Sequence, residues 1–254
     1  TVIGSASKPT YQRPVAIVPR AQLTPTLAEG RIVLELGDDR FWLLPRDLAD
    51  RTLFFTMRHG VSQVDSKIYR VGCRLPNLLD PERGMARADA VGSALARMVG
   101  VVGQQLDFLH LENYLDSRTF LHYISRSPNT RELYERVSSA LLQGAPASEP
   151  IVESALESSD FGWVTGLEKS LEVEEAARAF GVETSMAKRL MKDPLYSYPD
   201  GNSFFDLYVD VIDGLHRLGT AQKGKVACLY THSSTLRALM IYLDPRPFHE
   251  AFGE

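Results

Sequence analysis

The sequence predicts an α/β fold in which a mostly parallel central sheet lies between two layers of helices. Short apolar runs of strand length recur along the chain. Most of them are followed by a segment with apolar residues at helical spacing. This alternation is typical of parallel sheets, because a parallel pair of strands needs a crossover connection. The 254 residues, of which 44% are hydrophobic, suffice for one large domain or for a core with an appendage.

The N-terminal region is expected to lie outside the main sheet. Residues 1–30 are rich in Pro, Ser and Thr, and their four prolines disfavour regular structure, so we expect an arm or a linker. The segments 31–36 and 40–45 are apolar and flank the turn-prone sequence Gly-Asp-Asp at 37–39. This pattern predicts a β-hairpin extension over residues 31–46, at the start of a domain that spans residues 31–254.

Two strand–helix units follow the hairpin. Residues 53–57 form an apolar run, and a long polar loop leads from it to a helical pattern at 85–102. Residues 119–124 read as a second strand, and residues 132–142 as its helix. Repetition of the unit favours a parallel sheet over an antiparallel one.

A polar segment interrupts the sheet pattern. Residues 153–192 are predicted to be rich in helix, with an amphipathic helix at 172–180 that ends at Gly181. An insertion of this kind could lie over a site as a lid.

The pattern of strands and helices then resumes. A turn and helix cap at 198–203 lead into a core-facing helix at 204–218. A buried strand at 225–230 follows, and the chain enters another helix through Leu236.

Composition excludes several classes of function. A net charge of −4 and a pI near 5.9 argue against a general binder of nucleic acid, although a local basic pocket could hold a small phosphorylated metabolite. No stretch has the length of a membrane span, and the first residues do not resemble a signal peptide. The only cysteines, Cys73 and Cys228, are expected to be reduced thiols in a cytoplasmic protein. Because the chain begins at Thr1, it is expected to be an excerpt or a processed product, and another domain of a longer chain is among its expected partners.

Two histidines occupy equivalent positions at strand ends. His59 follows the apolar run at 53–57 within Arg-His-Gly, and His232 follows the strand at 225–230 within Thr-His-Ser. The carboxyl ends of parallel strands share one edge of a sheet, so the two imidazoles could face each other across a phosphate. The other histidines are interpreted as structural: His110, His122, His216 and His249.

Residues 53–242 resemble the histidine phosphatase superfamily, also called phosphoglycerate-mutase-like. Four blocks in the family's order carry the resemblance. They are the Arg-His-Gly at 58–60, a Ser-x-x-x-Arg element at 127–131, a stretch at 156–163 similar to the one that bears the general acid, and the Thr-His-Ser at 231–233.

The resemblance implies a phosphohistidine mechanism without a metal or a nucleotide. His59 would attack a phosphoryl group, while Arg58, Arg131 and His232 hold its oxygens. Guanidinium groups and imidazole donors stabilise the negative charge that a transferring phosphoryl group spreads over its oxygens. The alternative for Arg131 is a surface ion pair with Glu132 or Glu135.

Within the superfamily, the chain most resembles the bisphosphatase domain of 6-phosphofructo-2-kinase/fructose-2,6-bisphosphatase. Residues 196–204, Tyr-Ser-Tyr-Pro-Asp-Gly-Asn-Ser-Phe, are similar to a stretch of that family. The resemblance implies that a sugar phosphate contacts Arg189, Tyr198 and Ser233. It also implies a contact with Lys192 after a small register shift, because the family's lysine falls on the adjacent Asp193. Alternatively, Lys188, Arg189 and Lys192 form a solvated helix face.

Three residues depart from the family pattern in the catalytic region. Val61 stands where the family most often has Glu. Asp65 stands where it often has an Asn that contacts phosphate, and a carboxylate there would repel the anion. Ser158 falls at the position of the general acid. A hydroxyl is too weak an acid for that role, so Glu157 or Asp160 would have to replace it, or the acid is lost.

Three functions are therefore expected to compete. The first is a phosphomonoesterase of the fructose-2,6-bisphosphatase type, acting on a sugar phosphate and weakened by the missing acid. The second is a phosphate-binding or regulatory domain with little or no catalysis. The third is a phosphoglycerate mutase, which would return the phosphoryl group to its substrate.

Overall fold

The computed structural model describes residues 24–28, 31–36, 39–43, 52–64, 68–108, 116–145, 147–244 and 246–252. In residues 24–43, and at 98 and 101–108, only the backbone is described.

Three N-terminal strands form an antiparallel sheet in the order β1-β2-β3. Strands β2 (Arg31–Leu36) and β3 (Asp39–Leu43) form the hairpin that the sequence predicts. Strand β1 (Thr24–Ala28) was not predicted, because it contains Pro25 and falls in the expected arm. An edge strand tolerates proline, since one side of its backbone needs no partner. The rest of that arm, residues 1–23 and 29–30, lies outside the described residues.

The main sheet has four parallel strands in the order β4-β7-β5-β6. They are β4 (Leu53–Arg58), β5 (Leu121–Ile124), β6 (Ile151–Val152) and β7 (Val226–Thr231). The predicted mostly parallel α/β sheet is therefore confirmed. Arg58 pairs with Thr231 in register, so the residues that follow β4 and β7 emerge next to each other.

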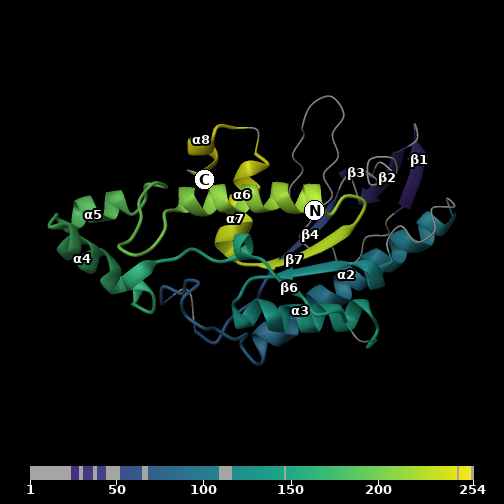
Figure 1. The fold of residues 1–254 in the computed structure, drawn as a ribbon, viewed down its shortest axis with the longest axis horizontal. Helices are drawn as coiled ribbons and strands as arrows, with labels where there is room; N and C mark the ends of the chain where they lie inside the picture. Colours follow the sequence, from purple (N-terminus) through teal and green to yellow (C-terminus); the bar gives the residue numbers. More distant parts are fainter. Residues whose placement is uncertain are drawn as a thin grey trace.

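Helices cover both faces of this sheet (Figure 1). On one face, Phe55 and Tyr230 share a core with α2 (Arg83–Phe108) and α3 (Pro128–Leu141). On the other, Leu229 packs with Leu218 of α6 (Phe204–Ala221), which in turn packs on α7 (Ser233–Tyr242). Successive side chains of a strand point to opposite faces, which is why neighbours such as Leu229 and Tyr230 join different cores.

Local signals account for the helix ends. Helix α6 begins at Ser203 with a capping box, in which the serine and Asp206 bond to each other's backbone N–H. Gly181 ends α4 (Lys169–Phe180) with φ 61°, a left-handed conformation that suits glycine. Helix α3 begins at Pro128, earlier than the predicted residue 132, because proline is favoured in the first turn.

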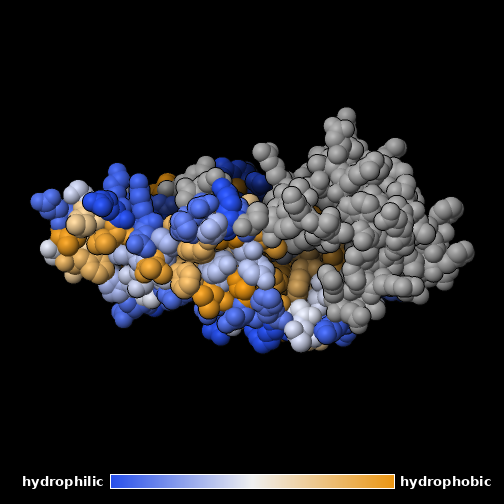
Figure 2. Space-filling view, turned by 90° about the horizontal axis from the view of Figure 1, so that it is seen from above, coloured by the Kyte–Doolittle hydropathy of each residue, from blue (hydrophilic) through white to orange (hydrophobic). Residues whose placement is uncertain are grey.

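The expected insertion at 153–192 contains two 3₁₀ turns and two helices. The turns are Ser154–Leu156 and Gly162–Val164, and α4 is followed by α5 (Thr184–Leu190). The two helices share a small alanine-rich core. Apolar side chains remain exposed in this region, and Figure 2 shows orange patches at this end of the molecule. The exposed apolar side chains are Leu171, Phe180, Met186 and Leu190 of the insertion, and Leu195 just after it.

Two short elements complete the fold, the 3₁₀ turn Ser117–Thr119 and α8 (Phe248–Phe252). None of the helices in the described part of the chain is long and apolar enough to span a membrane.

Candidate active site

His59 and His232 face each other at the carboxyl edge of the sheet. Their ring centroids are 5.0 Å apart, and the rings meet edge to face at 70°. Each histidine directly follows its strand, and the His59 N–H donates to the carbonyl oxygen of Thr231 at 3.2 Å. This backbone bond continues the pairing of β4 with β7 beyond the last strand residue. The fold thus brings together the two residues that the sequence analysis paired.

The hydrogen bonds of His59 fix which ring nitrogen carries its proton. Nδ1 lies 3.0 Å from the Gly60 carbonyl oxygen. Because a carbonyl can only accept, Nδ1 carries the hydrogen and Nε2 of the neutral ring keeps its lone pair. Ser62 Oγ lies 3.3 Å from the same Nδ1. Nε2 is therefore the nucleophilic atom of this ring.

His232 is held by a buried network at the end of β5. Its Nε2 is 2.8 Å from Ser125 Oγ. That hydroxyl also accepts from the Ser127 N–H at 3.1 Å and lies 3.0 Å from Thr130 Oγ1. Ser125 and Thr130 are fully buried, so the network fixes the orientation of the His232 ring.

Both rings are neutral near pH 7. Burial lowers the pKa of His59 to about 4, and the nearby Arg58 charge adds to this effect, although the hydrogen bond to Gly60 opposes it. Burial, and then His59, lower the pKa of His232 to about 3. An imidazole must be unprotonated to attack phosphorus, and His59 meets this condition.

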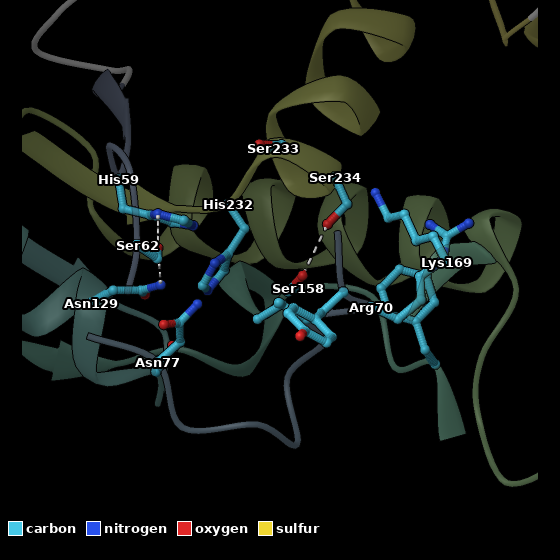
Figure 3. Close-up of a pocket in the computed structure, with 15 residues that line it drawn as sticks. His59, Ser62, Arg70, Asn77, Asn129, Ser158, Lys169, His232, Ser233 and Ser234 are labelled. Atoms are coloured by element: carbon cyan, nitrogen blue, oxygen red, sulfur yellow. Dashed lines mark hydrogen bonds between the residues drawn. The ribbon is translucent and has the colours of Figure 1, made fainter. Parts of the chain in front are cut away.

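A cavity of about 230 Å³ opens beside the two rings (Figure 3). The first turns of two helices form part of its wall. Ser127 directly precedes α3, while Ser233 and Ser234 begin α7. The free backbone N–H groups at a helix N-terminus and its dipole favour an anion. The described lining contains no Asp or Glu, which is consistent with the same preference.

Two cations line the cavity at the end opposite His59, as Figure 3 shows. Arg70 Nε donates to Glu172 at 2.6 Å, and its guanidinium lies over the Phe161 ring, 5.1 Å from the centroid. Lys169 is the first residue of α4. The insertion therefore contributes to the wall.

The structure does not place the predicted arginine ligands on the described cavity wall. Arg58 is exposed and bonds the His59 carbonyl at 3.4 Å. Arg131 is also exposed and pairs with Glu149 at 3.0 Å, not with Glu132 or Glu135.

The predicted sugar-phosphate contacts are divided. Ser233 lines the cavity. Arg189, in α5, and Lys192, just after that helix, are exposed and do not line the cavity, which agrees with the solvated-face alternative. Tyr198 is buried, and its hydroxyl donates to Glu172, so it supports the Arg70 ion pair from behind the wall.

Ser158 lies on the cavity wall, as the alignment with the acid-bearing stretch predicts, with its hydroxyl 3.4 Å from that of Ser234. The two carboxylates considered as substitutes have other partners. Glu157 accepts the Arg126 N–H at 2.8 Å, and burial raises its pKa. Asp160 pairs with Arg74 at 2.7 Å. Neither lines the cavity, and Asp65 falls outside the described residues.

No group of three or more His, Cys, Asp or Glu side chains in the described ranges is placed to hold a metal ion. Both cysteines are free thiols, with Cys228 buried in the core.

Several cavity residues were not singled out in the sequence: Ser62, Arg70, Asn77, Asn129, Lys169 and Ser234. Asn129 lies inside the Ser-x-x-x-Arg element and Ser234 directly follows the Thr-His-Ser, so proximity to a motif was an available signal. Arg70 and Asn77 belong to a long loop, whose path no local pattern predicts.

No family model matches the sequence, and no curated protein matches it. Solved structures do match the fold. Mycobacterial glucosyl-3-phosphoglycerate phosphatase aligns with a TM-score of 0.56 and 16% identity, over 80% of this chain and 84% of that one. The same phosphatase in complex with inorganic phosphate aligns with a TM-score of 0.54 and 15% identity, over 80% of this chain and 83% of that one. Phosphoglycerate mutase from Bacillus anthracis aligns with a TM-score of 0.57 and 15% identity, over 78% of this chain and 82% of that one. The chain has the phosphoglycerate-mutase-like fold.

Proposed function

We propose that this protein is a phosphomonoesterase that transfers a phosphoryl group to His59 and then to water. The observation that carries the proposal is the opposed pair of neutral imidazoles, in which His59 Nδ1 is bound to Gly60 and Nε2 is free to attack. The helix N-termini beside the pair supply a preference for anions. The solved relatives include a phosphatase crystallised with phosphate, which supports the proposal at the level of fold.

The reaction has two steps. First, Nε2 of His59 forms a bond to phosphorus while the bond from phosphorus to the ester oxygen breaks, and the departing alkoxide takes a proton from water. Water then attacks the phosphohistidine, releases inorganic phosphate and restores the imidazole. His232 and the N–H groups of α3 and α7 stabilise the charge on the phosphoryl oxygens.

Arg58 and Arg131 are proposed to join these donors once phosphate is bound. Arg131 must first leave Glu149. The Arg131 side chain is 44% exposed and that of Glu149 is 79% exposed. Ion pairs on the surface contribute little to stability. The exchange of a carboxylate for a phosphate dianion therefore costs little.

A sugar phosphate of the fructose-2,6-bisphosphate type is the substrate class that we propose. Two features support it: the sequence at 196–204, and the cations Arg70 and Lys169, which suit a substrate with a second polar or anionic end. Such a substrate would reach from the histidine pair to the insertion.

Turnover is expected to be slow, because Ser158 stands where a carboxylic acid should protonate the leaving group. Loss of a general acid typically costs about 10²- to 10⁴-fold in rate. The same observation favours the second candidate, a domain that binds a phosphorylated ligand without turning it over.

The experiment is phosphate release from a panel of sugar phosphates that includes fructose 2,6-bisphosphate. We expect slow release by the native chain, none by His59→Ala and no change in His249→Ala, an exposed histidine on α8. Ser158→Glu should raise the rate by about 10²-fold. No release by the native chain or by Ser158→Glu would contradict the phosphatase and leave the binding domain, and phosphorus NMR of the products separates hydrolysis from mutase transfer.

A further inference from the structure

Asn129 occupies an unusual place for an asparagine. It is the second residue of α3, is only 2% exposed and lines the cavity. Asparagine is mostly found on protein surfaces, since its amide is costly to remove from water without full hydrogen bonding. In Figure 3 its amide points toward Ser62 beneath the His59 ring.

The hydrogen bonding of this amide is incomplete. Its Nδ2 donates to Ser62 Oγ at 3.4 Å, which is long for such a bond. Its Oδ1 is buried and has no partner among the described residues. Asn77, the other asparagine on the wall, is satisfied by the backbone N–H and C=O of Val64. The Asn77 amide is therefore fully bonded to the protein, whereas the Asn129 amide has an acceptor without a partner among the described residues.

A half-turn of the Asn129 amide exchanges its two polar atoms. Oδ1 then accepts the hydrogen of the Ser62 hydroxyl, and Nδ2 takes the place of the unpartnered Oδ1 as a donor. The surroundings favour that arrangement when an anion is bound, because Ser127 and α3 place a helix N-terminus beside it and the described wall holds no carboxylate.

We propose that the Asn129 amide donates a hydrogen bond to an oxygen of the bound phosphoryl group and is anchored by Ser62, which contacts His59. The inference rests on the proposed function, since it assigns a further ligand to the same phosphate. It gives this end of the cavity a neutral donor while Arg131 is paired with Glu149.

Titration of the 254-residue chain with inorganic phosphate, followed by phosphorus NMR, tests the assignment. Asn129→Asp keeps an oxygen acceptor but loses the donor and adds a negative charge. We expect its affinity for phosphate to fall about 10- to 100-fold, as for loss of a hydrogen bond to a charged group. Asn129→Ala should lose about 10-fold. Ser138→Ala, a buried serine on the same helix, should bind phosphate as the native chain does.

The outcomes separate this inference from the proposed function. Native-like phosphate affinity in Asn129→Asp, or in Asn129→Ala should the first variant not fold, overturns the role of Asn129. If the native chain does not bind phosphate, both the inference and the proposed site are wrong. If it binds phosphate and the variants weaken binding, but no substrate is hydrolysed, the inference stands and the phosphatase fails.

Discussion

Glu172 is the buried charge on which the end of the cavity remote from His59 depends. Its side chain is 2% exposed, and it accepts from Arg70 at 2.6 Å and from the Tyr198 hydroxyl. Such a carboxylate is stable only while its partners remain, because an unpaired buried charge is costly. Arg70 is therefore both a cation of the cavity and a support for α4.

Replacing Arg70 tests this double role. Arg70→Met should lower the free energy of unfolding by about 1–3 kcal/mol, since it leaves a buried acceptor of Glu172 without its donor. Adding Glu172→Met should recover much of the loss, because the charge is removed with its partner. Arg178→Met, which breaks an exposed pair with Glu175, should cost less than about 1 kcal/mol. Urea denaturation of the four proteins measures these differences, and equal losses for Arg70→Met and Arg178→Met would contradict the role of Arg70.

Helix α6 fits closely against the 3₁₀ turn Ser154–Leu156, which leads to Ser158. Gly214 permits this approach, since a Cβ atom there would lie 2.2 Å from the Cβ of Ala155. Gly219, five residues further along the helix, has no such constraint, because the nearest atom to a Cβ there would be in the Phe54 ring, at 3.8 Å. The position of the segment that carries Ser158 thus depends on one glycine of α6.

The two glycines form a matched pair for mutation. Gly214→Ala should destabilise the protein by about 1–3 kcal/mol, because the added methyl group forces the helix and the turn apart. Gly219→Ala should be neutral or stabilise by about 0.5–1 kcal/mol, because alanine favours a helix over glycine. Thermal unfolding of both variants is the measurement. A stabilising Gly214→Ala would show that the contact between α6 and the turn is loose.

Element prediction succeeded where pattern and length agreed. The apolar runs gave β4, β5 and β7, and helical spacing gave α2, α4 and α6. It failed where the structure depends on distant partners. Strand β6 is only two residues long, and both are exposed. No local sequence pattern indicates its pairing with β5. Strand β1 contains a proline that is acceptable only because the strand lies at an edge.

At the scale of the molecule, three histidines among the described residues link stability to pH: His122 and His232, which are buried, and the half-buried His59. Burial lowers the pKa of His59 and His122 to about 4, and burial followed by His59 lowers that of His232 to about 3, all from 6.5. Between these values and pH 6.5 the unfolded chain binds protons that the folded chain does not. Stability therefore falls as pH falls through this window and is fully present above about 6.5.

The free energy of unfolding, measured by denaturation between pH 6.5 and 5, reports mainly on the histidines, because most carboxyl groups titrate below this range. Each histidine should contribute up to about 1.4 kcal/mol per pH unit. His122→Gln, which leaves the cavity intact, should reduce the slope by about a third, whereas the exposed His249→Gln should not change it. Glu157 has the opposite effect on stability, because burial raises its pKa and the folded chain then binds its proton more readily than the unfolded chain does. A stability that does not change over this range would contradict neutral, buried imidazoles.

The site was only partly predictable from the sequence. His59, His232, Ser158 and Ser233 could be placed because each directly follows a predicted strand or lies in a family-like block. The orientations of Arg58 and Arg131 could not, because a long side chain can turn to a partner such as Glu149, and no spacing encodes that choice. The contribution of Lys169 depends on how the insertion folds back on the sheet.

The central claim is that His59 accepts a phosphoryl group on Nε2. Mass spectrometry of the protein, quenched in base during turnover of a sugar phosphate, measures this directly, because phosphohistidine survives base and is lost in acid. We predict a phosphorylated peptide that contains His59 in the native chain and its absence in His59→Ala. Phosphate release without phosphorylation of His59, or phosphorylation that persists in His59→Ala, would contradict the account.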